Sequence, residues 1–417
     1  MGFSVDDRCL CIGRNRIPLG CGIIEGVMTP GRETLIRSIL ADSLSHGMPA
    51  IVLQNGSSSG SGILQSWMTE YTYGGSIPHV FDMIRDRYDE GGIDILRGLD
   101  YDMASRYILD IFRELRTDLS SSTLEFCRMY LRVLADLMNK LNDPTLVFSI
   151  ANLRYFTREW IEKKVEFLCR KSRMSESDSR FYEDFIFNYL PDHRAQEYEF
   201  RDLCMTLNQY DLSTHLSQGP SVDDILSRNT MLFVTLDCMH KPEQSAAVMK
   251  ALIRCIVEKQ VKDPTISMAI VCEDIDIGKN EDLRTLMMNC SRYGASNFFF
   301  TDNNISAFSR GGNWDPVQQS DSFFVFQQVS PDNTKYWSDL IGTKRTTEVS
   351  KQYEFGLPFR PISSTRFPTI VPIIDPREFT RLRDGECFFI SRVPRKKSLL
   401  SGDSGSNNMF VEKLIFR

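Results

Sequence analysis

The sequence predicts an α/β fold, a mostly parallel sheet with helices on both faces, that is interrupted by an inserted all-α domain. Three observations support this. Two short apolar runs flank a helical segment near the N-terminus, the middle of the chain has helical periodicity, and apolar runs alternating with helices return in the second half. Such alternation is typical of buried parallel strands joined by helices. At 417 residues the chain is long enough for two domains.

Residues 1–63 are predicted to form the first part of the α/β domain. Cys21–Glu25 and Ala50–Leu53 are apolar runs, and Glu33–Leu44 between them has helical spacing. This is the pattern of a βαβ unit, the usual connection between two parallel strands. The glycine- and serine-rich tract Asn55–Gly62 then predicts a flexible surface loop.

Residues 64–219 are predicted to be the inserted all-α domain. Apolar side chains recur there every three or four residues, which is the spacing of one helix face. The predicted stripes, which we interpret as core, are Met103, Tyr107, Ile108, Ile111, Phe112, Leu115 and Leu119; Leu124, Cys127, Leu131, Leu134 and Leu141; Phe156, Trp160, Ile161 and Leu168; and Phe181, Phe185, Ile186 and Tyr189.

Residues 220–395 are predicted to complete the α/β domain, with 396–417 as a C-terminal tail. Ser221 and Asp224 have the spacing of a capping box at the start of a short helix. Strands are expected at Met231–Leu236, Ile266–Cys272, Asn297–Thr301 and Ser322–Val329, and helices at Pro242–Val261, Glu281–Cys290 and Asn333–Ile341. From Arg345 onward the pattern indicates mostly strand and loop.

Composition and charge narrow the class of protein. The net charge of −6 argues against a polycation that wraps nucleic acid, but it leaves DNA open as a partner through a local basic channel. The 11 scattered cysteines indicate reduced thiols rather than a disulfide scaffold. Neither the cysteines nor the five histidines have metal-ligand spacing, so we expect no metal site. No run of about 18 apolar residues is present. We therefore expect a cytoplasmic protein, with a peripheral position at the inner face of the cell membrane, reached only through a partner, as the alternative.

The segment Gly26–Thr34, between the first strand and the first helix, has the glycine spacing of a phosphate-binding loop. That motif reads G-x-x-x-x-G-K-[ST], and its backbone N–H groups surround phosphate oxygens. Arg32 stands at the lysine position, Glu33 at the hydroxyl position that binds Mg²⁺, and Thr34 one residue later. The alternative is an ordinary helix start, with Thr29 as N-cap and Pro30 as the first helical residue. This segment alone leaves both interpretations open.

Two later segments favour the phosphate-loop interpretation. The apolar strand before Cys272 ends in Glu273-Asp274, where a motor ATPase places an acidic pair for Mg²⁺ and for the attacking water. The order of the two acids is reversed here. Further on, a helix ends at Arg292-Tyr-Gly294, and the next strand ends at Thr301-Asp302.

The order of these elements resembles the VirD4/TraG type IV coupling proteins, within the FtsK- and HerA-like hexameric DNA-pumping ATPases. Asp339–Gly342 and the closing segments Pro376–Leu382 and Gly385–Ile390 are similar to late motifs of that family. The resemblance covers residues 20–55 and 221–392. It implies a RecA-like P-loop NTPase domain, with other subunits of a secretion or DNA-transfer complex and a homo-oligomeric ring as partners.

The resemblance also implies roles for single residues. Gly26, Thr29, Gly31, Arg32, Glu33 and Thr34 would contact ATP; Glu273, Asp274 and Asp302 would act in hydrolysis; and Arg292 would reach a neighbouring subunit's nucleotide as an arginine finger. The family's Lys, Ser/Thr, Asp-Glu and Gln are, however, replaced here by Arg32, Glu33, Glu273-Asp274 and Asp302.

Because every position that handles phosphate, metal or water is altered, we expect ATP and Mg²⁺ to be held weakly or not at all. The first hypothesis is therefore a pseudo-ATPase or adaptor subunit of a conjugative DNA-transfer or type IV secretion apparatus. The alternative is an active, ring-forming motor that translocates DNA.

Overall fold

The structure, a computed structural model, describes residues 9–12, 15–18, 21–27, 29–45, 47–56, 79–84, 92–143, 146–209, 212–227, 230–275, 280–293, 296–302, 315–354, 357–392 and 409–416. Most of the predicted loop at 55–62, and Gly294, lie outside these ranges. Within them, no helix is both long and apolar enough to cross a membrane.

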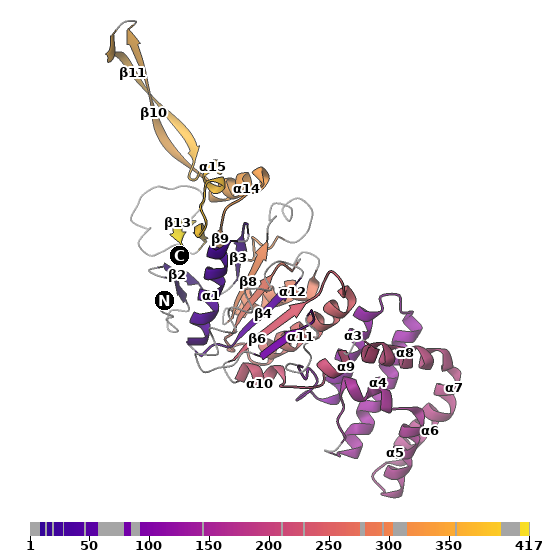
Figure 1. The fold of residues 1–417 in the computed structure, drawn as a ribbon. Coiled ribbons are helices and arrows are strands. Elements are labelled where there is room, and N and C mark those ends of the chain that lie inside the picture. The colour runs from indigo at the N-terminus through magenta and orange to yellow at the C-terminus, as the bar shows by residue number, and fades with distance from the viewer. Residues whose placement is uncertain are drawn as a thin grey trace. The chain divides into compact units, whose positions relative to one another are not determined.

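The chain divides into two compact units. The first unit joins residues 1–46 to residues 269–417, and the second comprises residues 47–268. Figure 1 shows the elements of both, from the N-terminal strands to the C-terminal strand β13.

The first unit is built on strands with helices between them. Its elements are β1 (Cys9–Ile12), β2 (Asn15–Pro18), β3 (Cys21–Glu25), α1 (Pro30–Ser45), β7 (Ala269–Glu273), α12 (Glu281–Tyr293), β8 (Asn297–Asp302), β9 (Ser322–Val325), α14 (Pro331–Ile341), β10 (Thr343–Glu354), β11 (Leu357–Pro372), α15 (Pro376–Thr380), β12 (Glu386–Ser391) and β13 (Phe410–Ile415). Six of these strands lie side by side in the order β13-β12-β9-β3-β8-β7.

The strand β3 lies in the middle of this order and is parallel to both its neighbours. Its residues pair with β8 from Cys21 opposite Phe298 to Glu25 opposite Asp302, and with β9 on the other side. β7 is parallel to β8, whereas β12 is antiparallel to β9 and to β13. Every residue of β3 and β7 is buried. This explains their apolar sequences, because strands covered on both faces do not alternate.

The second unit combines three parallel strands with a series of helices. Its elements are β4 (Ala50–Asn55), β5 (His79–Asp82), α3 (Tyr101–Leu115), α4 (Ser121–Leu141), the 3₁₀-helix η3 (Ile150–Tyr155), α5 (Arg158–Arg170), α6 (Glu176–Asp184), the π-helix η4 (Phe185–Tyr189), α7 (Leu190–Asp192), α8 (Arg194–Gln209), α9 (Leu212–His215), α10 (Val222–Ser227), β6 (Met231–Leu236) and α11 (Pro242–Lys262). The strand order is β4-β6-β5.

The predicted fold class is confirmed, and many elements begin or end within a few residues of their predicted limits. β6 and α11 are clear cases. The helices α3 to α9 all lie inside the segment predicted as an all-α insertion. The predicted capping box is also present, because the Ser221 amide donates to Asp224 Oδ2 and the Asp224 amide donates to Ser221 Oγ, both at 3.0 Å. The predicted domain boundaries remain a prediction.

Three features of the structure differ from the predictions made from the sequence. The strand β5 lies within the segment predicted to be helical, and four residues are too short to show alternation. The strand β13 lies within the predicted tail and pairs with β12. Phe181, predicted in a core stripe, is 46% exposed, whereas its neighbour Tyr182 is buried and donates to Asp136 of α4. The π-helix η4 that follows has more residues per turn than an α-helix, so it changes which residues of the predicted stripe face the core.

Candidate functional site

The candidate phosphate loop lies between β3 and α1, and its second half is a capped helix start. α1 begins at Pro30. The Arg32 amide donates to Thr29 Oγ1 at 3.3 Å, and the Glu33 amide donates to the Thr29 carbonyl at 3.2 Å. The Thr34 hydroxyl donates to the Pro30 carbonyl at 2.9 Å. Thr29 therefore serves as the N-cap, and Thr34 turns toward its own helix.

Two further amides of the loop donate to distant segments of the same unit. The Val27 amide donates to the Gln327 carbonyl at 3.1 Å, and the Gly31 amide lies 3.4 Å from Asp384 Oδ1. Gly31 packs so tightly on Gly385 that an added Cβ would lie 2.2 Å from the Gly385 Cα. The turn before β12 thus presses a carboxylate and a backbone atom onto the start of α1, the place where a phosphate would bind.

The Arg32 side chain fills the centre of this loop. It is completely buried, and its Nη1 donates to the Gly26 carbonyl at 2.9 Å. Its Nη2 lies 3.4 Å from Asp274 Oδ1 and 3.9 Å from Glu273 Oε1. The structure therefore brings the predicted loop cation and the predicted acidic pair together, but as a buried ion pair of the protein itself.

Glu273 is the most perturbed carboxylate of this cluster. Burial raises its pKa from 4.5 to about 7; the Arg32 charge opposes this rise, and the Asp274 and Glu33 charges add to it. Its Oε1 accepts no hydrogen bond from the described residues. A buried carboxyl group with a pKa near neutrality is a feature of general acids and bases, although structural ion pairs also produce it.

The backbone at Asp274 has an unusual conformation. Its φ angle is +53°, in the left-handed region that costs energy for a residue other than glycine. Its amide donates to Thr301 Oγ1 at 2.9 Å, at the end of β8. Asp302 follows as the last residue of β8 and pairs with Glu25 at the end of β3. The acidic pair and the predicted sensor strand therefore end beside the loop, while the Asp302 side chain lies outside the description.

Arg292, the predicted finger, lies in the last turn of α12 with an exposed side chain. Its role toward a neighbouring subunit stays a prediction. Glu33 lies one turn into α1, half-buried.

Two carboxylates at this site were not predicted from the sequence. Asp384 contacts the loop from a segment more than 350 residues away in the chain. Glu25, the last residue of β3, is completely buried and accepts a hydrogen bond from Trp337 Nε1 of α14. A buried glutamate directly before a glycine-rich loop was the available signal for Glu25. No sequence signal pointed to Asp384, because it reaches the loop only in the folded protein.

These residues do not fit a nucleotide with Mg²⁺. Four amides of the loop and helix start already donate within the chain, and the arginine is committed to an ion pair. The hydroxyl that would bind Mg²⁺ is replaced by the Glu33 carboxylate, and the nearby Thr34 hydroxyl bonds its own helix. As the loop stands, an anion would have to displace Asp384 and reorient Arg32 before it could bind.

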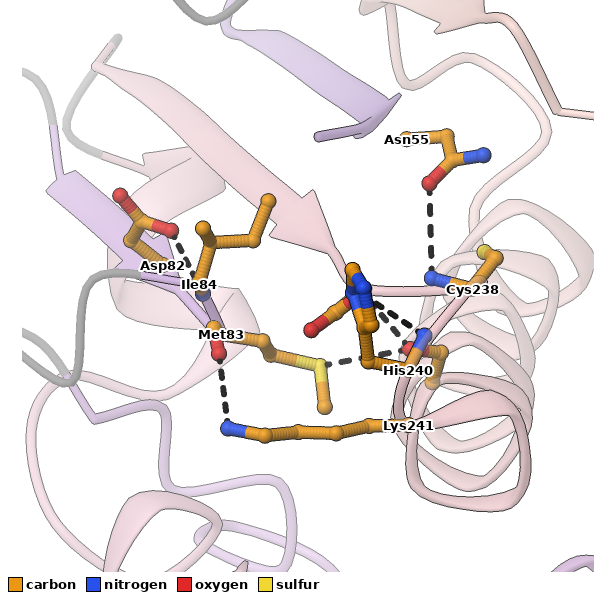
Figure 2. Close-up of polar contacts among 9 residues, drawn as sticks. Asn55, Asp82, Met83, Ile84, Cys238, His240 and Lys241 are labelled. Atoms are coloured by element: carbon orange, nitrogen blue, oxygen red, sulfur yellow. Dashed lines mark hydrogen bonds and ion pairs between the residues drawn. The ribbon is translucent and has the colours of Figure 1, made fainter. Parts of the chain in front are cut away.

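A second polar cluster lies in the other unit, where β4, β5 and β6 end. Asp237 follows β6, and its Oδ1 accepts from the His240 amide at 3.0 Å and lies 2.9 Å from His240 Nδ1. The Cys238 amide lies 3.4 Å from Asn55 Oδ1 at the end of β4 (Figure 2). His240 is 70% exposed, and Asp237 fixes its ring orientation.

The same cluster ties β5 to the start of α11. Lys241 Nζ donates to the Met83 carbonyl at 3.1 Å, and the Ile84 amide donates to Asp82 Oδ1 at 2.9 Å (Figure 2). Among the described residues, no group of three or more His, Cys, Asp or Glu side chains could hold a metal ion. We interpret this cluster as a junction that holds the strand ends and the helix together.

The comparisons with known proteins support the fold. No family model matches the sequence, and no curated protein matches it. Among solved structures, the bacterial conjugative coupling protein TrwB in its unbound monoclinic form matches with a TM-score of 0.54 at 11% identity, over 98% of this chain and 89% of that one. TrwB in complex with ADP and Mg²⁺ matches with 0.52 at 12% identity, over the same shares.

A third solved structure is similar as well. VirB4 of Thermoanaerobacter pseudethanolicus matches with a TM-score of 0.50 at 9% identity, over 95% of this chain and 89% of that one. At such low identity the likeness concerns the fold. The chain therefore has the RecA-like P-loop ATPase fold of TrwB and VirB4.

Proposed function

We propose that this protein is a coupling-protein-like subunit of a conjugative DNA-transfer or type IV secretion apparatus, and that it acts as a pseudo-ATPase or adaptor. The fold of TrwB and VirB4 supports the process. The chemistry of the loop supports the loss of turnover. In this proposal the P-loop is a structural element whose phosphate-binding groups are bound to the protein itself. The subunit binds other subunits of the complex and does not hydrolyse ATP.

One observation carries the proposal: the groups that would bind phosphate are already bound to the chain. Asp384 stands at the Gly31 amide, and Arg32 is paired with Asp274 while Glu273 lies 3.9 Å away. Loss of a single preorganised catalytic group typically lowers a rate about 10²–10³-fold. Here the cation, the hydroxyl ligand, the acidic pair and the sensor position all differ from a motor, so turnover is expected to be negligible.

The alternative, an active ring-forming motor, is favoured by one feature. The pKa of Glu273, raised to about 7, suits a carboxylate that takes a proton from water near neutral pH. TrwB has been solved with ADP and Mg²⁺. For this chain the motor hypothesis requires the loop to open, with Asp384 leaving Gly31.

Two measurements distinguish the hypotheses. Calorimetry with Mg²⁺·ATP on the full chain should detect no binding at micromolar concentrations, and phosphate release should stay at background with and without DNA. Turnover of about one per second or faster, abolished by Arg32→Ala, would overturn the pseudo-ATPase proposal. Arg377→Ala is the charge-matched control, because this arginine is exposed on α15 and is not one of the residues expected to contact ATP.

A set of variants tests which residues prevent ATP binding. Arg32→Lys combined with Glu33→Ser restores the P-loop sequence G-x-x-x-x-G-K-S. Asp384→Ala removes the carboxylate that accepts from the Gly31 amide. We expect the double variant to bind ATP weakly, because Asp384 still occupies the Gly31 amide, and the triple variant to bind more tightly. Equal binding by both would show that Asp384 does not close the site.

A further inference from the structure

The hairpin formed by β10 and β11 is joined to the first unit at its base. Its strands contain 12 and 16 residues and form a two-stranded sheet, without a third strand among the described residues. Among the described residues, its base is anchored by the Ile373 amide, which donates to the Gly342 carbonyl at 3.0 Å, and by Ser338 Oγ, which donates to the Ile374 carbonyl at 2.7 Å. Figure 1 shows it as a ribbon that runs out beyond α14.

An isolated two-stranded hairpin is marginally stable in water, so a hairpin of this length gains from a partner on one face. Apolar side chains near its base are also open to solvent. Phe367 is 53% exposed and Ile370 is 66% exposed. Ile370 is opposite Arg345 and Phe367 is opposite position 348, so the two lie on different faces of the ribbon, and both faces present an exposed apolar side chain.

The charge of the hairpin is opposite to that of the chain. Residues 343–372 contain five basic and two acidic side chains, a net charge of +3. The whole chain carries −6, so the remainder carries −9. The hairpin is thus a positive arm on a negative protein, and its charge complements a polyanion.

The strand register concentrates this charge on one face. Arg345 is opposite Ile370, Arg366 is opposite Val349, and position 351, a lysine, is opposite Ser364. Residues opposite each other share a face, and every second residue of a strand returns to that face. Positions 345, 349 and 351 of β10 therefore mark one face, with three basic residues and no acidic residue up to the register shift at Gln352.

The other face has a different composition. Lys344, opposite Val371, belongs to it, as does position 348, a glutamate, opposite Phe367. One positive and one negative residue leave that face neutral along the same length. Lys344 and Arg345 are adjacent, exposed and equally charged, yet they lie on opposite faces, so they form a natural matched pair for experiment.

One edge of the ribbon, that of β11, disfavours a partner strand. β11 contains prolines at positions 358, 361, 368 and 372. Proline has no N–H to donate, and within strands it is confined to edges, where it blocks the addition of another strand. The β11 edge is therefore closed to a partner strand, whereas β10 contains no proline, so the preference for a face rests on the charge pattern.

We propose that the basic face of the β10–β11 hairpin, marked by Arg345, Arg366 and Lys351, binds double-stranded DNA. The major groove of B-DNA is about 12 Å wide and admits a two-stranded β-ribbon. From position 345 to position 351 the basic face extends about 20 Å, which corresponds to about six base pairs. The deep, narrow groove of an RNA duplex would not admit the ribbon. This inference does not depend on the state of the nucleotide loop.

The test measures DNA affinity of the full chain by fluorescence anisotropy, with a duplex of about 20 base pairs and a salt series. Each lost phosphate contact lowers the slope of log affinity against log salt by about 0.9, which is about 8-fold in affinity at 0.1 M salt. We expect Arg345→Gln to weaken binding about 8-fold and Arg345→Gln with Arg366→Gln about 60-fold. Lys344→Gln, with the same charge change on the other face, should change it less than 2-fold.

Several results would overturn the proposal. Equal losses for Lys344→Gln and Arg345→Gln would show that net charge alone attracts DNA. Unchanged affinity of the double variant would place DNA binding elsewhere or nowhere, and tighter binding of an RNA duplex would exclude the groove argument. A change in sedimentation mass without a change in DNA affinity would assign the arm to contacts between copies of the chain. Circular dichroism that matches the wild type establishes that the variants fold.

Discussion

Replacing Glu273 by glutamine should change how stability depends on pH. The pKa of Glu273 is raised from its ordinary value of 4.5 to about 7, chiefly by burial. The native state therefore binds this proton more tightly than the unfolded chain does. The proton contributes fully to stability below pH 4.5, and its contribution is lost as the pH rises to about 7. At about 1.4 kcal/mol per pH unit, the loss is about 3 kcal/mol.

Glutamine keeps the shape and the hydrogen-bonding capacity of the protonated acid but cannot ionise. At pH 8 we therefore expect Glu273→Gln to be about 3 kcal/mol more stable to unfolding than the wild type, and at pH 4.5 about equally stable. Arg32 retains Asp274 and the Gly26 carbonyl as partners in the variant. Urea unfolding followed by tryptophan fluorescence, repeated from pH 4.5 to 8, measures the difference.

The difference between the two proteins carries the information, because other groups titrate equally in both. Glu378→Gln removes an exposed carboxylate from the same unit and controls for the change in net charge. A difference that is constant with pH, or a variant that is less stable at pH 8, would refute the reasoning. Either result would mean that Arg32 keeps Glu273 ionised throughout.

Three other substitutions test the packing and capping described above. Gly31→Ala should cost about 3 kcal/mol or more and lower the melting temperature, because its Cβ would lie 2.2 Å from the Gly385 Cα; an unchanged melting temperature would contradict this contact. Ser221→Ala should cost about 1 kcal/mol in urea unfolding through loss of a helix cap, whereas a change near zero would mean that the box contributes nothing. Trp337→Phe should cost about 1–3 kcal/mol, because it removes a donor to the buried Glu25 carboxylate, and Glu25→Gln should partly restore stability.

The fold was accessible from the sequence because its central strands are buried on both faces. Such strands must be almost wholly apolar, so β6 and β7 stand out as runs bounded by polar residues. The helices of the second unit were recognisable for the related reason that one face of each is buried. The short strand β5 and the phase shift at η4 were missed, because four residues or a single π-turn produce no periodic signal.

The candidate site was accessible only in part. The spacing of Gly26 and Gly31 located the loop, and the pair Glu273-Asp274 located the strand end that meets it. The sequence left open whether Arg32 would face a ligand or the protein, since that depends on burial and on long-range partners. Asp384 closes the loop from the far end of the chain, and no local pattern around it points to this contact.

The first unit consists of two segments that are far apart in the sequence, and this affects the order in which the protein folds during synthesis. β3 is paired on one side with β8, which is made 277 residues later (from Cys21 to Phe298), and on the other side with β9, which is made 300 residues later (from Gly22 to Ser322). At about 5–20 residues per second, the ribosome needs roughly 10–50 s to pass from the end of the first segment to the end of β8. The second unit, whose residues are contiguous, can fold within this interval. Until β8 and β9 have been made, β3 lacks both strands that pair with it. We therefore expect its apolar residues to be exposed in the nascent chain, where chaperones bind such surface.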